Sequence, residues 1–257
     1  MELKNYLSLS DTLARMRMKS QANKLALSYL WWIIEPLLFV SLFYVLFEYI
    51  LHRGGDDYFS FMIVGKIVYL WFSKSVTTAS TSLVSNKGIL SQRAIPKWVF
   101  PISNVQECAY KSTISFALLC AILIINGILP TIYWLQLIPL TVITYIFIVS
   151  ISLLSSILVS VARDFTNLIN MGMLGLMFAS GIFWDISSIN DETLKSLVLY
   201  LNPLASVIFL YREVLLESKI IDLSLFKPIL IYSVVFMSLS LTIFRSFNNK
   251  LTRLIFS

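Results

Sequence analysis

Residues 29–51, YLWWIIEPLLFVSLFYVLFEYIL, form one apolar stretch that is long enough to cross a lipid bilayer. The stretch holds two acidic side chains and no basic one, and roughly 20 apolar residues at about 1.5 Å per residue span a ~30 Å hydrocarbon core. The basic residues just before it are Arg15, Arg17, Lys19 and Lys24. Because basic clusters stay on the cytoplasmic side, we expect the chain to begin inside and to cross outward here.

The composition indicates that this stretch is one of several spans. Hydrophobic residues make up 58% of the chain and charged residues 13%, whereas the surface of a water-soluble globule needs more charge. The formal net charge of +6 does not indicate a nucleic-acid partner, because the basic residues lie beside hydrophobic stretches and set orientation. Cys108 and Cys120 are interpreted as packing residues. With His52 as the only histidine, we expect no histidine-based metal site or catalytic dyad within one chain.

The hydropathy pattern predicts a single all-α membrane domain with six transmembrane helices. The expected spans cover residues 29–51, 59–82, 112–128, 137–160, 166–184 and 226–244. Residues 1–25 are expected to form an amphipathic helix at the cytoplasmic interface, with Ser10 or Asp11 able to cap its start. Thirteen Lys or Arg residues fall in the expected inner segments and five in the outer ones, which places both termini inside.

A further apolar segment, residues 197–216, is not expected to be a seventh span. Asn202-Pro203 interrupts it, and Arg212-Glu213 would place two charges in lipid. A full crossing would also put the basic residues after position 244 on the outside. We therefore expect a re-entrant or interfacial helical hairpin on the outer side, between spans five and six, where protein covers its irregular backbone.

Nothing in the sequence predicts catalysis. No stretch matches G-x-x-x-x-G-K-[ST], and Gly65-Lys66 lies inside an expected span. A glycan-handling enzyme would need placed carboxylates or a base near a donor, whereas the acidic doublet Asp56-Asp57 occupies an outer turn. We expect no catalytic residues, no metal site and no cofactor in this chain.

An aromatic stripe runs along the first span. Its members are Trp32, Phe39, Phe43 and Phe47. Their spacing puts them on one helical face, which suits either packing against neighbouring helices and lipid or a passage where the apolar face of a sugar ring lies on the rings. Glu35 shares this sector and lies about as deep as Lys74 in the second span, so the two could form an ion pair. A proton relay is the rival interpretation.

The segment after the second span, residues 86–101 (NKGILSQRAIPKWVFP), combines basic, apolar and proline residues on the expected cytoplasmic side. It could be an ordinary basic anchor of the membrane topology. Trp98 and the paired prolines favour instead a docking surface for a cytosolic partner, because aromatic and Arg side chains anchor interfaces. In the fifth span, Gly175-x-x-x-Ala179 is a small-residue pair that allows close helix approach, although this motif is weak alone.

Several of these features occur in the order found in one family. They are the interfacial helix, Leu30-Trp31 to Glu35-Pro36, then Asn86, Leu90, Pro96 and Pro101, then Arg163-Asp164, Asn202-Pro203, Arg212-Glu213 and a short basic tail. With them the sequence resembles the membrane permease subunit of ABC exporters for bacterial capsule, O-antigen and related lipid-linked polysaccharides, a type-2 ABC transporter permease.

The resemblance implies a half-transporter in the bacterial inner membrane with both termini cytoplasmic. Two copies would form a central passage for lipid-linked polysaccharide, and two cytosolic ABC ATPase subunits would bind the ATP and Mg. The first and fifth spans would line the passage through Trp32, Glu35, Phe39, Phe43, Phe47 and Phe178. ATPase coupling would involve Asn86, Leu90, Arg93, Pro96, Lys97 and Trp98. The outer gate would involve Asn202, Pro203, Arg212 and Glu213.

Alternative functions keep or change this architecture. The same permease could export teichoic acid, another lipid or a drug. An ion-coupled carrier or channel that uses Glu35, Lys66 and Lys74 would act without an ATPase, and Lys66 and Lys74 match no motif of the resembled family. A membrane-bound glycan enzyme is the remaining class.

Overall fold

The computed structural model describes residues 2–24, 28–50, 58–92 and 95–246, and these residues are helical with short connections. The first half comprises α1 (Glu2–Lys24), α2 (Ser28–Val45) with a π-helical end η1 (Leu46–Ile50), α3 (Tyr58–Ser80), α4 (Ser82–Ser85), α5 (Lys87–Gln92) and α6 (Val99–Ile125). The second half comprises η2 (Ile132–Gln136), α7 (Leu137–Val161), α8 (Phe165–Ala179), η3 (Ile186–Ser188), α9 (Glu192–Leu201), α10 (Pro203–Leu215), η4 (Leu223–Leu225) and α11 (Phe226–Ser246). The described ranges contain no strand.

Four of the described helical segments are long and apolar enough to cross a membrane. They are Tyr58–Ser80, Val99–Ile125, Ile132–Val161 and Leu223–Ser246. The pair α9 and α10 would make a fifth if it is counted as one span, but its two helices meet at 109°. Helix α2 has 18 residues and the apolar helix α8 has 15. The chain is thus an all-helical protein with four or five candidate spans among the described residues.

Helix α6 begins at Val99, well before the third span that the sequence predicts at residues 112–128. Pro101 lies in the first turn of α6, where a missing N–H costs no intrahelical hydrogen bond. Asn104, Glu107 and Lys111 then recur at a spacing that puts them on one face of a helix. The chain between the second and third predicted spans therefore contains α5 and the first half of α6.

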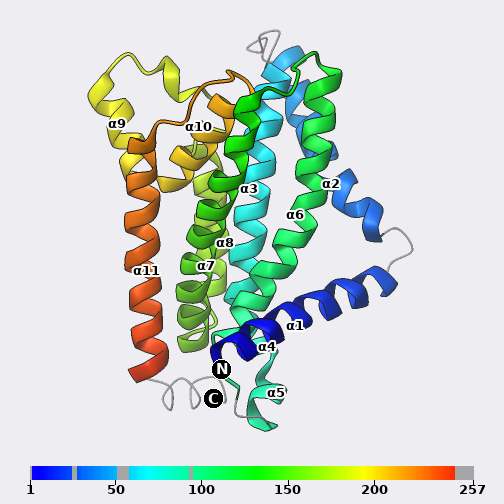
Figure 1. The fold of residues 1–257 in the computed structure, drawn as a ribbon, viewed down its shortest axis with the longest axis vertical. Helices are drawn as coiled ribbons and strands as arrows, with labels where there is room; N and C mark the ends of the chain where they lie inside the picture. The colour runs from blue at the N-terminus through cyan, green and yellow to red at the C-terminus, as the bar shows by residue number, and fades with distance from the viewer. Residues whose placement is uncertain (1, 25–27, 51–57, 93–94, 247–257) are drawn as a thin grey trace.

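Helix α3 is the centre of the bundle and contacts α2, α6, α7, α8 and α10 (Figure 1). Most of its side chains are buried, and the ring of Phe72 stacks on that of Phe147 in α7 at a centroid distance of 5.7 Å. Helix α7 presents small buried side chains to its neighbours, and Ser150, Ser156 and Ser160 donate to carbonyl oxygens of their own helix. Such self-satisfied serines allow close helix contact in lipid.

The two ends of the bundle carry different elements (Figure 1). Helix α1 lies across the end at which α4 and α5 lie, whereas α9 and α10 lie at the opposite end. Ser10 and Asp11 do not cap the start of α1, because that helix begins at Glu2. Ser10 is instead buried in mid-helix, and its hydroxyl donates to the carbonyl oxygen of Tyr6 at 3.0 Å.

Candidate functional site

Glu35 of α2 and Lys74 of α3 form an ion pair, which confirms the pairing predicted from their depths in the first two spans. The side chain of Glu35 is 36% exposed and that of Lys74 is 49% exposed, so the pair lies at the surface of this single chain. It joins two helices that are adjacent in the sequence. An ionisable group at this depth is costly unless it has such a partner.

Lys66, which precedes Lys74 in α3, is buried. Its Nζ donates to Sδ of Met177 in α8 at 3.4 Å and lies 4.9 Å from the ring centroid of Tyr69. The hydroxyl of Tyr69 donates to the carbonyl oxygen of Met173 at 2.7 Å, again in α8. Helix α3 thus meets α2 through Lys74 and α8 through Lys66 and Tyr69.

The aromatic stripe of the first span falls on α2 and η1. The side chains of Trp32, Phe39, Phe43 and Phe47 lie outside the described part of the chain, so the stripe stays a prediction. Phe178, the sixth expected pathway residue, is in α8, where its side chain is 54% exposed and its ring lies 5.5 Å from that of Phe183.

One face of α8 is exposed over most of its length. Its large members are Leu168, Met171, Leu174 and Phe178. Between them, a Cβ added at Gly172 or Gly175 would meet nothing within 4 Å in this chain. Close approach of another helix to Gly175 and Ala179 therefore stays a prediction, and the face is open to it.

The expected coupling segment is held to α1. The guanidinium of Arg17 donates to Oδ1 of Asn86 at 3.0 Å and to Oγ of Ser103 at 3.2 Å. Asn86 is the C-cap of α4 and precedes α5, while Ser103 is in the first turns of α6. One side chain therefore joins three of the elements at this end of the bundle. Burial lowers the pKa of Arg17, although Glu107 nearby counteracts it.

The other expected coupling residues lie around this contact. The ring of Trp98 meets that of Tyr6 edge-on at 6.2 Å, and Leu90 packs against the core from α5. The carbonyl of Pro96 accepts from the N–H of Val99 at 3.1 Å, which starts α6. Lys97 is buried, and that burial lowers its pKa. Arg93 lies outside the described residues.

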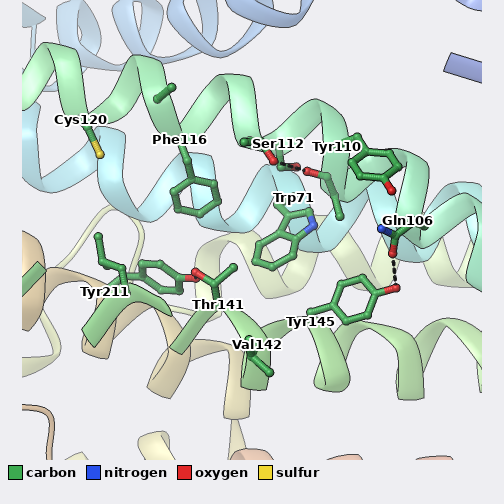
Figure 2. A pocket seen from close by; sticks show the side chains of 14 residues that line it. Trp71, Gln106, Tyr110, Ser112, Phe116, Cys120, Thr141, Val142, Tyr145 and Tyr211 are labelled. Atoms are coloured by element: carbon green, nitrogen blue, oxygen red, sulfur yellow. Dashed lines mark hydrogen bonds between the residues drawn. The ribbon is translucent and has the colours of Figure 1, made fainter. Parts of the chain in front are cut away.

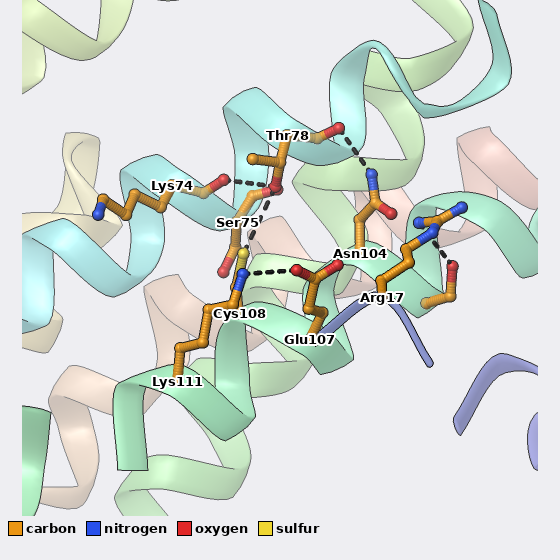
Figure 3. Close-up of polar contacts among 9 residues, drawn as sticks. Arg17, Lys74, Ser75, Thr78, Asn104, Glu107, Cys108 and Lys111 are labelled. Carbon is orange, nitrogen blue, oxygen red and sulfur yellow. Dashed lines mark hydrogen bonds and ion pairs between the residues drawn. The ribbon is translucent and has the colours of Figure 1, made fainter. Parts of the chain in front are cut away.

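A polar cluster follows on the face that α6 turns toward α3 and α1 (Figure 3). Lys111 pairs with Glu107, and Nδ2 of Asn104 donates to the carbonyl oxygen of Thr78 at 2.8 Å. These residues, with Arg17, Ser85, Asn86 and Cys108, line a cavity of about 250 Å³. Arg17, Asn104 and Glu107 are absent from the site residues predicted from the sequence. The i, i+3, i+7 spacing of Asn104, Glu107 and Lys111 is the signal that could have identified this face.

The expected outer-gate residues fasten α10 to the end of α8. The guanidinium of Arg212 donates to the carbonyl oxygens of Phe61 at 3.1 Å, Gly181 at 2.6 Å and Ile182 at 3.0 Å. Its Cζ lies 3.4 Å from the ring centroid of Phe61. A Cβ added at Gly65 would approach Nη2 of Arg212 to 2.6 Å, so the lack of a side chain at that position makes room for the guanidinium.

Asn202, Pro203 and Glu213 complete this region. The side chain of Asn202 accepts from the N–H of Ala205, and its Nδ2 donates to Oγ of Ser180 at 3.0 Å. Pro203 begins α10, where proline is favoured. Oε2 of Glu213 is buried without a hydrogen-bond partner among the described residues, and burial raises the cost of its charge.

These apolar helices, with charged contacts between them and polar contacts at one end, define a multi-pass membrane protein. The chain belongs to the ABC-2 type transporter family, whose profile matches residues 12–216. It is 30% identical over 190 residues to an O-antigen export system permease protein of Klebsiella pneumoniae, which covers 74% of this chain and 73% of that protein. It is 25% identical over 246 residues to an O-antigen export system permease protein of Myxococcus xanthus, which covers 95% and 94%.

Proposed function

We propose that this chain is the transmembrane subunit of an ATP-driven exporter that moves lipid-linked polysaccharide, O-antigen or capsule, across the bacterial inner membrane. The observation that carries the proposal is the similarity to the Myxococcus xanthus O-antigen export permease over 95% of the chain. A long hydrated glycan needs a continuous protein-lined route through hydrocarbon, and a multi-pass permease can provide one.

The proposed topology has six spans: α2 with η1, α3, α6, α7, α8 and α11. Both termini lie in the cytoplasm, and α9 and α10 form a re-entrant hairpin on the outer side. The 109° bend between α9 and α10 supports the hairpin, because two helices that turn back on each other at this angle do not form one continuous crossing of the bilayer. The position of α1 and α5 at the end opposite to α9 and α10 supports the assignment of the two sides (Figure 1).

The proposed passage forms between two copies of the chain, lined by α2 and α8. The open face of α8, with its bare Gly172 and Gly175, supports this pairing because another helix can approach it closely. Trp32, Phe39, Phe43, Phe47 and Phe178 would carry the apolar faces of the sugars, beside the Glu35–Lys74 pair. The copies would repack when ATP is bound and hydrolysed.

Energy would come from two cytosolic ATPase subunits that hold ATP and Mg and dock on the segment from Asn86 to Trp98. The contact of Arg17 with Asn86 and Ser103 supports this role, because it links the docking segment to both α1 and α6. The role of Asn202, Pro203, Arg212 and Glu213 would be to hold the outer gate.

Co-purification with the neighbouring reading frames tests the proposal. We expect a protein with Walker motifs to co-purify with this chain in mild detergent, and the complex in vesicles to move lipid-linked polysaccharide only with ATP. If the vesicles instead accumulate teichoic acid, another lipid or a drug, the cargo assigned here is wrong although the architecture stands. Transport by the chain alone, driven by an ion gradient without ATP, would overturn the proposal in favour of a carrier.

A further inference from the structure

A long groove runs between α6 and α7, on α3 as its floor (Figure 2). It has a volume of about 650 Å³ and is lined by residues of α6 and α7 together with Trp71 of α3 and Tyr211 of α10. Figure 2 shows Trp71 in the middle, Cys120 and Tyr211 toward one end, and Gln106 with Tyr145 toward the other. The groove belongs to none of the sites described above.

The groove has the dimensions of a single hydrocarbon chain. From Gln106 to Cys120 it follows α6 for about 21 Å at ~1.5 Å per residue, which is enough to cover the ~15 Å of one leaflet. A volume of about 650 Å³ over that length corresponds to a mean cross-section of about 31 Å². An α-helix of about 10 Å diameter needs roughly 80 Å². A helix of a second copy can therefore cover the groove but cannot lie inside it.

The lining changes from apolar to polar toward α1. Phe116, Ala117 and Leu137 line the part away from α1, and the two hydroxyls there, of Thr141 and Tyr211, hydrogen-bond to each other at 3.0 Å. At the other end, the hydroxyl of Tyr145 donates to Oε1 of Gln106 at 2.6 Å. Tyr110 lies beside them and donates to Asp11 of α1. The groove thus has the polarity profile of a lipid, with its headgroup end at the interface helix.

The ion pair of Arg15 and Asp11, at the polar end of the groove, offers one positive and one negative group. Arg15 donates to Oδ2 of Asp11 at 2.9 Å, and its Cζ lies 5.3 Å from the ring centroid of Tyr110. The side chain of Arg15 is 66% exposed and that of Asp11 is 38% exposed. A guanidinium binds phosphate well, while a carboxylate accepts from a primary ammonium. A headgroup with both groups complements the pair.

We propose that the α6–α7 groove binds one chain of a phospholipid whose headgroup carries phosphate and a primary ammonium, with the phosphate at Arg15 and the ammonium at Asp11. The bound lipid connects α1 to α6 and α7. This proposal does not depend on the exported cargo.

Fluorescence of Trp71 tests the site, because its indole lines the groove although only 4% of the residue is exposed. The other five tryptophans are replaced by Phe, and the full chain is placed in phosphatidylcholine vesicles with increasing brominated-chain phosphatidylethanolamine. We expect strong quenching of Trp71. Half-maximal quenching should need a roughly two- to five-fold lower fraction of this lipid than of brominated-chain phosphatidylcholine, whose quaternary ammonium cannot donate to Asp11.

Ala117→Phe fills the groove and should abolish most of the quenching. Ala121→Phe is the matched control, because Ala121 is an exposed residue of the same helix that does not line the groove. Asp11→Asn should remove the preference for phosphatidylethanolamine but keep quenching by chains, because the two lipids differ only in the ammonium that Asp11 accepts from. Equal quenching in the Ala117→Phe and Ala121→Phe variants, or equal response to both lipids in the parent, would overturn the proposal.

Native mass spectrometry of the chain with all its tryptophans gives a second measurement that does not depend on the Phe replacements. After exchange into detergent with added phosphatidylethanolamine, the wild type and Ala121→Phe should retain one lipid. Ala117→Phe should retain several-fold less. Equal retention in all three proteins would contradict a groove-bound lipid.

Discussion

The guanidinium of Arg212 donates to the carbonyl oxygen of Gly181 at 2.6 Å, which ties α10 to the chain that leaves α8. Gly181 has a φ of +71°, a left-handed conformation that glycine adopts without strain and that presents its carbonyl to the arginine. Because Arg212 also donates to the carbonyl oxygens of Phe61 and Ile182, it connects α10 both to α3 and to the segment that follows α8.

Replacing Arg212 by Met should destabilise the protein, because three carbonyl oxygens lose a charged donor at once. We expect a loss of about 3 kcal/mol or more, or roughly 5–10 °C in the thermal midpoint in detergent. Arg212→Lys should retain only part of the wild-type stability, because an ammonium lacks the planar set of N–H donors that a guanidinium directs at several carbonyl oxygens. Arg245→Met, at an exposed position of α11, is the control and should change little. A midpoint for Arg212→Met equal to the control would contradict this role.

The Glu35–Lys74 pair should be structural. Lys74→Met and Glu35→Gln should each lower export, and the exchange Glu35→Lys with Lys74→Glu should recover part of it. The stability coupling in a double-mutant cycle should be no more than about 1 kcal/mol, because both side chains are more than a third exposed. Intact folding and export in Lys74→Met would show that the pair has no such role.

Replacement of Arg93 and Trp98 by Ala should separate ATP hydrolysis from export. Trp98 contacts Tyr6 of α1, so its loss weakens the connection between the docking segment and the interface helix. The measurements are ATPase activity and polysaccharide export by the same reconstituted complex, with membrane insertion as a check. Trp98→Phe keeps an aromatic ring and should retain most coupling. Unchanged export by the double Ala variant would count against docking.

Phe39→Ala and Phe43→Ala should impair polysaccharide export more than folding, if their rings line the passage. Loss of a packing ring, by contrast, would lower export and the thermal midpoint together. The comparison is export rate against midpoint for each variant. Losses in proportion would support the packing interpretation of the stripe.

Acid should loosen the contact between α1 and α6. The pKa of Asp11 lies below its ordinary value of 3.8, mainly because the hydroxyl of Tyr110 donates to its carboxylate. A depressed pKa contributes stability that is present above pH 3.8 and is lost as the pH falls through the lower, folded-state pKa. Thermal midpoints between pH 5 and pH 3 should therefore fall less in Asp11→Asn and Tyr110→Phe than in the wild type. Identical pH profiles would contradict this contribution.

The features that could be predicted from the sequence are those that hydropathy and depth determine. The apolar stretches predict most of the helices, and the equal depth of Glu35 and Lys74 predicts their ion pair, because a charge in lipid needs a near partner. Asn202-Pro203 predicts the break between α9 and α10, since proline removes a helical N–H.

Contacts between distant segments could not be predicted in this way. Hydropathy does not show that Arg17 reaches both Asn86 and Ser103, because that depends on where α1 crosses α6. The early start of α6 at Val99 was missed because its first turns are too polar to resemble a span. The α6–α7 groove arises from the packing of four helices and leaves no local pattern.

Asn202 and Arg212 both donate hydrogen bonds to the segment that follows α8. Asn202 donates to Oγ of Ser180, and Arg212 donates to the carbonyl oxygens of Gly181 and Ile182. We therefore expect α9, α10 and the end of α8 to move as one unit. A tilt of α8 within the bundle would then displace α9 and α10 directly, through these hydrogen bonds.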